Sequence, residues 1–245
     1  MNYKRFTLIS TLILVILTTN ACGFGWVRGS GNLITESRNI SNIDRVDLGG
    51  SGKLIITQSG EESLTIETDD DMMQYVSTEV RDGTLYLGFE GRDSKNQTLS
   101  PTRLRFTLTV KNLTGIGVSG SGDISTASLD TDRLEVNISG SGEVQVDSLM
   151  AREVEVGISG NGNVELAGEV TGQDIGINGS GQYDAENLRS KTVKINIGGS
   201  GDATVWAIES LDASIGGNGS VRYYGNPQTS FSNSGSGKIK GLGEK

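Results

Sequence analysis

The chain has 245 residues, including 36 Gly, 2 Pro and no His, and only 5% of its residues are aromatic. The lack of His excludes Ser-His-Asp and Cys-His nucleophilic sites, and it removes the usual imidazole ligands of zinc, copper and iron. The formal charge of −9 argues against nucleic acid as a partner, because binding to phosphates needs a basic face. Abundant glycine with almost no proline and no collagen period predicts many tight turns, and therefore a chain rich in strands.

Residues 1–21 are predicted to be a signal peptide. Lys4 and Arg5 give a basic start, and an apolar run of about twelve residues then extends from Phe6 to Leu17. A helix that crosses a bilayer needs about twenty residues, so this run does not indicate a permanent transmembrane helix. Loss of Lys4 and Arg5 with the signal would take the formal charge from −9 to −11.

Cys22 is the only cysteine, and it stands where the signal ends. The segment Thr18-Thr19-Asn20-Ala21-Cys22 resembles a bacterial lipobox, which implies a diacylglycerol on Cys22 and a mature chain that begins there. It departs from that pattern in having Thr19 and Asn20 where Leu and a small residue are preferred. The alternative is a plain secretory signal followed by an unpaired thiol. Residues 22–32, glycine-rich and containing Trp26, are predicted to be a flexible tether.

A Gly-Ser/Asn-Gly tripeptide recurs seven times in the second half of the chain, at spacings of 20, 20, 19, 20, 18 and 18 residues. Apolar and polar residues alternate on both sides of each tripeptide, as expected for half-buried strands. A unit of this length cannot bury its own apolar face and must stack on its neighbours. The sequence therefore predicts an all-β fold, a single-stranded right-handed parallel β-helix or β-solenoid, with regular repeats over 116–245.

Each tripeptide is expected to be either a tight corner, where glycine supplies a positive φ, or part of a flat polar face. In both cases the middle residues should form a ladder of small polar groups, joined from coil to coil by hydrogen bonds and able to face a ligand. These residues are Ser121, Ser141, Asn161, Ser180, Ser200, Asn218 and Ser236. The next position should form a second, mixed row of acids and amides, suited to saccharide hydroxyls, from Asp123, Glu143, Asn163, Gln182, Asp202, Ser220 and Lys238.

Residues 33–115 contain an earlier tripeptide at 50–52, followed by strand-like runs at 63–68, 84–89 and 103–110, a short helix near 72–80 and a polar loop at 91–101. We interpret this part as larger, irregular first coils of the same solenoid, so that residues 33–245 form one body. Asp69, Asp70 and Asp71 are weak candidates for oxygen ligands of Ca²⁺, and the ordinary alternative is a solvated turn. No other metal ligands and no cofactor are expected.

The segments Ser63–Glu67 and Thr78–Tyr86, the serial Gly-Ser-Gly coils and a literal Gly-Ile-Asn at 176–178 resemble the bacterial head GIN domain family, described as "putative auto-transporter adhesins". The resemblance covers roughly residues 33–240. It implies a right-handed β-helix at the cell surface or in the periplasm, and it implies no reaction and no site residues.

The resulting hypothesis is a non-catalytic lipoprotein, anchored through Cys22 in the outer membrane, that presents the solenoid for adhesion or envelope interaction. The expected partners are the membrane and a surface glycan or protein. No catalytic residues are predicted. The alternatives are a β-helical polysaccharide lyase or hydrolase, which needs a carboxylate pair or a Ca²⁺ site beside a base, and a purely structural envelope component.

Overall fold

The computed structural model describes residues 25–245, and the predicted signal peptide and Cys22 lie outside them. The described chain is all-β, with one 3₁₀ turn at Met73–Tyr75, where a short helix was predicted. No helix in it is long and apolar enough to cross a membrane. The strands are β1 Trp26–Arg28, β2 Leu33–Arg38, β3 Arg45–Leu48, β4 Lys53–Gln58, β5 Ser63–Asp69, β6 Val76–Arg81, β7 Thr84–Phe89, β8 Thr98–Ser100, β9 Leu104–Val110, β10 Gly115–Val118, β11 Asp123–Thr126, β12 Leu129–Ile138, β13 Glu143–Ile158, β14 Asn163–Ile177, β15 Gln182–Ile197, β16 Asp202–Ile215, β17 Ser220–Tyr224, β18 Gln228–Asn233 and β19 Lys238–Gly243.

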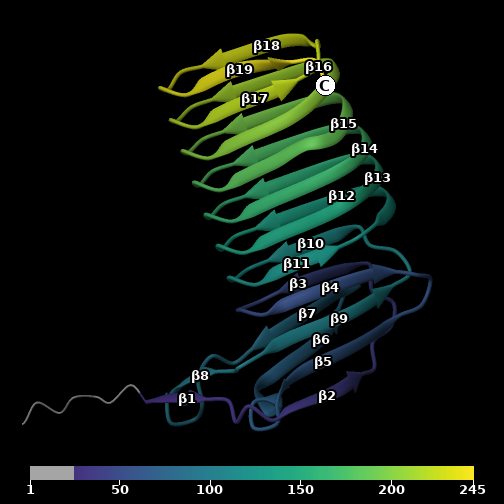
Figure 1. Cartoon of the computed structure of the whole chain (residues 1–245), viewed down its shortest axis with the longest axis vertical. Coiled ribbons are helices and arrows are strands. Elements are labelled where there is room, and N and C mark those ends of the chain that lie inside the picture. The colour runs from purple at the N-terminus through teal and green to yellow at the C-terminus, as the bar shows by residue number, and fades with distance from the viewer. Residues whose placement is uncertain (1–24) are drawn as a thin grey trace, which may run out of the picture.

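The regular coils form a parallel β-solenoid, which confirms the predicted fold class (Figure 1). Each of the long strands β13 to β16 runs from one tripeptide to the next and bends halfway. In β13, residues 143–146 lie on what we call the first face, residues 147–152 on the broad edge and residues 153–158 on the second face. The tripeptides form the narrow tripeptide edge between the two faces, on the left of Figure 1. They are therefore corners, as the first of the two alternatives predicts.

The core fills the space between the two faces. Alternate residues point into it, so that Val144, Val146, Val154 and Val156 are at most 1% exposed, and the coils above and below repeat the pattern in register. Differences in coil length are absorbed at the broad edge, where the pairing shifts between Val146 and Leu149. The tripeptide edge therefore stays in register although the repeats have 18 to 20 residues.

The tripeptide glycines are required by stacking. A Cβ on the first glycine of any of the seven tripeptides would lie 1.8–2.1 Å from a backbone oxygen of the coil below. None of these glycines has a positive φ; among the tripeptides, only the earlier one has it, at Gly50 and Gly52. The predicted reason for glycine, a positive φ at each corner, is therefore wrong for the regular coils. Their corners are joined by backbone hydrogen bonds to the corners of the next coil, and the two backbones are too close to leave room for a side chain.

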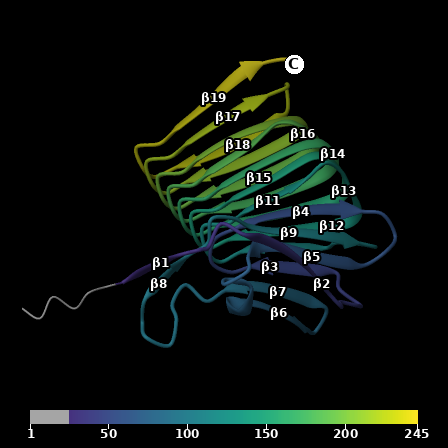
Figure 2. The same ribbon diagram turned by 60° about the horizontal axis from the view of Figure 1, so that its bottom comes forward.

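The N-terminal part stacks in an order different from its order in the sequence. β3 and β4 lie directly below β10 and β11, with Val46 beside Ile116 and Leu54 beside Ile124. The intervening chain passes beneath them, so that β7 and β9 form the next coil down. Antiparallel strands β6, β5 and β2 then close this end of the core (Figure 2). The irregular first coils are thus partly an antiparallel cap within the same 17-stranded sheet.

Residues 26–32, which belong to the predicted tether, lie beside this cap. β1 pairs in parallel with β8, which lies in the predicted polar loop. At the opposite end of the stack, β18 is exposed along its whole length, and the terminal Lys245 folds back so that its Nζ donates to Glu186 O at 2.6 Å.

Candidate ligand-binding surfaces

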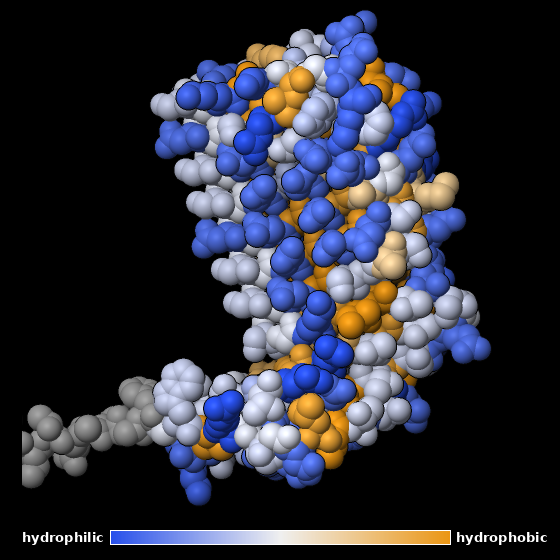
Figure 3. Space-filling model, viewed as in Figure 1, coloured by the Kyte–Doolittle hydropathy of each residue, from blue (hydrophilic) through white to orange (hydrophobic). Residues whose placement is uncertain are grey.

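The middle residues of the tripeptides are aligned one above another. The backbone N–H of Ser141 donates to Gly120 O at 2.9 Å, that of Asn161 to Gly140 O at 3.0 Å, and the same bond recurs at each later tripeptide. All seven predicted ladder residues are exposed, and Figure 3 shows their edge as a column of small projecting groups on the left of the stack. Because stacked strands are about 4.8 Å apart, these groups are presented at a fixed and regular spacing.

The ladder side chains do not bond to one another. In the described chain, no hydrogen bond uses the hydroxyl or amide of the seven middle residues, and the one such contact nearby joins Ser119 Oγ to Asp47 Oδ1 at 2.9 Å. The predicted hydrogen bonds from coil to coil are therefore made by the backbone. The side-chain hydroxyls and amides are left to water or to a ligand.

The row that follows the tripeptides also stacks as predicted. Asp123, Glu143, Asn163, Gln182, Asp202, Ser220 and Lys238 are successive register partners along the first face. A shallow hollow of about 180 Å³ lies in the middle of this row, lined mainly by Glu143, Asn163, Gln182 and the neighbouring Glu165 and Asp184. Carboxylates and amides thus project side by side from a rigid sheet, next to the hydroxyls of the tripeptide edge.

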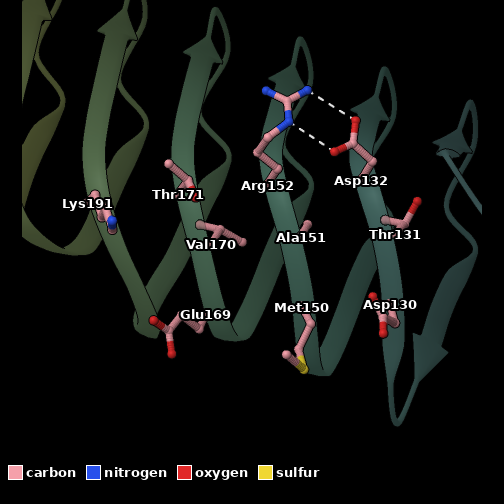
Figure 4. A pocket seen from close by; sticks show the side chains of 10 residues that line it. All are labelled: Asp130, Thr131, Asp132, Met150, Ala151, Arg152, Glu169, Val170, Thr171 and Lys191. Atoms are coloured by element: carbon pink, nitrogen blue, oxygen red, sulfur yellow. Dashed lines mark hydrogen bonds and ion pairs between the residues drawn. The ribbon is translucent and has the colours of Figure 1, made fainter.

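A second hollow, not predicted from the sequence, lies on the broad edge (Figure 4). It has a volume of about 400 Å³ and crosses four coils. Thr131, Ala151 and Val170 lie along its middle, and Met150, which is 62% exposed, stands at one end. A smaller hollow that shares Asp130 and Met150 extends it toward Gln58. We call the two together the broad-edge groove.

The broad-edge groove contains an ion pair between two neighbouring coils. Arg152 Nε and Nη2 donate to the two carboxylate oxygens of Asp132 at 3.0 and 3.1 Å. These hydrogen bonds and the positive guanidinium lower the pKa of Asp132, and the same bonds and the negative carboxylate raise the pKa of Arg152. Both groups therefore stay ionised, and Asp132 is unsuited to donate a proton. A ligand in the groove would meet charged and polar side chains around a small apolar strip.

One signal in the sequence points to this groove. Asp132 and Arg152 are 20 residues apart, which is one repeat, and the exposed pairs Glu169–Arg189 and Asp174–Lys194 have the same spacing. Opposite charges one repeat apart therefore mark side chains that lie side by side on the surface of adjacent coils. The hollow itself follows from the bend of the strands.

The Asp69–Asp71 segment is hydrogen-bonded to residues 30–32. The buried Asp69 carboxylate accepts hydrogen bonds from Gly31 N at 2.8 Å, Thr102 N at 2.6 Å and Thr102 Oγ1 at 2.6 Å. Burial opposes ionisation of Asp69, but these bonds outweigh it, and its pKa is lowered. Asp70 accepts from Ser30 Oγ, which lowers its pKa.

No group of three or more Asp, Glu or Cys in the described residues is arranged to hold a metal ion. Arg103, which directly precedes β9 beside the acidic segment, pairs with Glu67 at 2.8 Å, and Lys111, which directly follows the other end of β9, pairs with Glu62 at 3.1 Å. The structure thus brings the predicted ladders together on one edge and one face, and it does not bring the predicted carboxylates together as metal ligands.

Comparison with known proteins agrees with this architecture. The model of the family described as "Putative auto-transporter adhesin, head GIN domain" matches residues 42–227. The chain belongs to this family. The matched residues include the strands from β3 to β17, whereas β1 and β2 precede them and β18 and β19 follow them.

Solved structures resemble this head GIN protein along nearly its whole length. A protein from Bacteroides fragilis whose structure is titled a putative adhesin is 32% identical, with a TM-score of 0.82 over 88% of this chain and 100% of its own. A protein from Parabacteroides distasonis, titled a putative lipid binding protein, is 26% identical, with a TM-score of 0.75 over 89% of this chain and 99% of its own. A search of curated proteins gave no match.

Proposed function

We propose that this head GIN protein is a non-catalytic envelope lipoprotein that uses its solenoid to bind a surface glycan or protein. The observation that carries the proposal is the pair of rows in register, the unbonded Ser and Asn side chains of the tripeptide edge and the acids and amides of the first face. Groups fixed at a regular spacing cost little ordering entropy on binding, so a repetitive ligand such as a polysaccharide gains from each coil it contacts.

The proposed anchor is a lipid on Cys22, with the outer membrane as its location. The support is the predicted export signal, the position of the only cysteine at its end, and the adhesin names of the family and of a relative in Bacteroides fragilis. Cys22→Ser should move the protein from the membrane fraction to the soluble fraction. Unchanged fractionation of the variant would end this part of the proposal.

The test of binding is a glycan array probed with the chain lacking residues 1–21. We expect retention without the appearance of products over time. A triple variant of the first-face row, Glu143→Ala, Asn163→Ala and Gln182→Ala, should lose most of the retention. The matched control changes exposed polar residues of the second face, Asn196→Ala and Ser232→Ala, and should bind normally.

Two results would contradict this assignment. Equal retention of the triple variant and the control would remove the first face from the binding surface, and a Met150→Ala, Lys191→Ala variant would then test the broad-edge groove. Shortened products would favour the polysaccharide lyase or hydrolase. In the broad-edge groove, Asp132 is held ionised by Arg152 and is therefore unsuited to be the general acid of such an enzyme.

A further inference from the structure

The N-terminal strand β1 and its partner β8 form an arm beside the cap. These two strands make a separate two-stranded parallel sheet, at the lower left of Figure 1. Val27 pairs with Leu99, which is only 6% exposed, so this side of the arm is covered. Alternation then directs Trp26 and Arg28 to the opposite side. Trp26 is 75% exposed, the largest value among the exposed large apolar side chains of the described chain.

The arm is tied to the cap through Asp69. Gly29 N donates to Ser100 O at 3.0 Å, which continues the pairing of β1 with β8, and Gly31 N donates to the buried Asp69 carboxylate of the cap at 2.8 Å. A Cβ on Gly29 would lie 2.3 Å from Asp69 Oδ2, so glycine is required for this close approach. The exposed Trp26 is therefore carried by a segment whose position is fixed relative to the solenoid.

The position of Cys22 places a strict limit on where an anchor can lie. Cys22 precedes Trp26 by four residues, and an extended chain advances at most about 3.6 Å per residue, so their Cα atoms are within about 14 Å of each other. A lipid on Cys22 would therefore bring Trp26 to the membrane surface. The C-terminal strands lie at the opposite end of the stack (Figure 1).

The charge of the arm suits a phospholipid surface. Residues 25–29 and 91–100 contain the basic Arg28, Arg92 and Lys95 and one acid, Asp93, in a chain of net charge −9, and the exposed Asp70 and Asp71 beside the arm are hydrogen-bonded to Ser30. The Asp93 carboxylate is engaged in its own loop, accepting from Lys95 N at 3.0 Å and Gln97 N at 2.8 Å. Basic side chains are attracted to lipid phosphates, and Trp is enriched at the level of the headgroups in membrane proteins.

We propose that the β1–β8 arm is a membrane-docking element: Trp26 inserts among the headgroups of the bilayer that holds the Cys22 lipid, and Arg28 contacts lipid phosphates. This rests on the proposed lipid anchor. The cap then faces the membrane, the C-terminal end of the solenoid points away from it, and the tripeptide edge and the broad-edge groove are displayed along a rod of fixed orientation.

The experiment places the full lipidated protein in vesicles of three parts phosphatidylethanolamine to one part phosphatidylglycerol. Trp206→Phe leaves Trp26 as the only tryptophan. Its emission should shift to shorter wavelength relative to the same protein with Cys22→Ser in solution, and lipids brominated near the headgroup should quench it by at least about half. Arg28→Glu should reduce this quenching.

A matched control reports on the far end of the solenoid. Phe231, 44% exposed on β18, is replaced by Trp in a Trp26→Phe, Trp206→Phe background, and its emission should be unaffected by brominated lipids. Quenching at residue 231 equal to that at Trp26 would overturn the orientation. Protein that floats with vesicles while Trp26 stays unquenched would overturn the docking and leave the anchor intact. Absence of the lipid mass on Cys22 would overturn the anchor itself, and the docking with it.

Discussion

Replacing one tripeptide glycine by alanine tests the physical basis of the stack. In Gly160→Ala, the new Cβ would lie 2.0 Å from Gly140 O, about 1.4 Å closer than ordinary contact. Both atoms belong to backbones that are hydrogen-bonded on either side, through Ser159 N to Ile138 O at 2.8 Å and Asn161 N to Gly140 O at 3.0 Å. No side-chain rotation can relieve the contact, so the two coils must separate at this corner.

The expected loss of stability follows from that separation. Two weakened hydrogen bonds are worth about 1 kcal/mol each, and overpacking in a closely stacked region costs about 1–3 kcal/mol. Alanine also reduces the conformational entropy of the unfolded chain, which stabilises the folded state by about 0.4–1 kcal/mol. The net effect is a loss of about 2–4 kcal/mol in the free energy of unfolding, measured as a lower midpoint of urea denaturation at constant slope.

Gly176→Ala is the matched control. Gly176 lies in β14 without a positive φ, and its added Cβ would have its nearest neighbour, Val156 O, at 4.0 Å. Its free energy of unfolding should change by less than about 0.5 kcal/mol, as for most unstrained surface changes. If Gly160→Ala lost no more stability than Gly176→Ala, close stacking of the corners could not be the reason for glycine.

Three further predictions concern polar groups. Tyr183→Phe removes the hydrogen bond from Tyr183 Oη to the buried Gln173 Oε1 at 2.5 Å; the unsatisfied acceptor should cost about 1–3 kcal/mol in urea denaturation, with Tyr75→Phe as a neutral control. Because the pKa of Asp69 is lowered in the folded state, its contribution to stability is present above its unfolded pKa of about 3.9 and is lost as the pH falls through the folded value. In Asp69→Asn, the melting temperature should therefore depend less on pH in this acidic range. An unchanged pH profile would count against a stabilising role of the Asp69 carboxylate. Arg152→Gln should leave the melting temperature unchanged, because its ion pair is exposed. A clearly lower melting temperature would mean that this ion pair stabilises the stack of coils.

The tripeptide repeat and the alternation of apolar residues were sufficient to predict the regular half of the molecule. In a solenoid each coil contacts only its neighbours, so a constant period specifies which residues meet, from Asp123 and Glu143 onward. The role of the corner glycines could not be predicted in the same way. The local sequence indicates a turn, but it does not indicate how closely two stacked backbones approach each other. They are so close that a Cβ at Gly140 would lie 1.8 Å from Gly120 O.

The sequence by itself determined the strands, the inward face of each and the order of the coils from residue 115 onward, because all of these depend on period and on adjacent repeats. Only the tertiary structure decided that β7 and β9 lie beneath β3 and β4, that Asp69 secures Gly31, and that the strand bearing Trp26 is joined to the cap. These contacts join residues that are 38 to 72 positions apart and share no repeat. Such pairings are selected by packing and by the need to satisfy buried polar groups, and no local pattern encodes them.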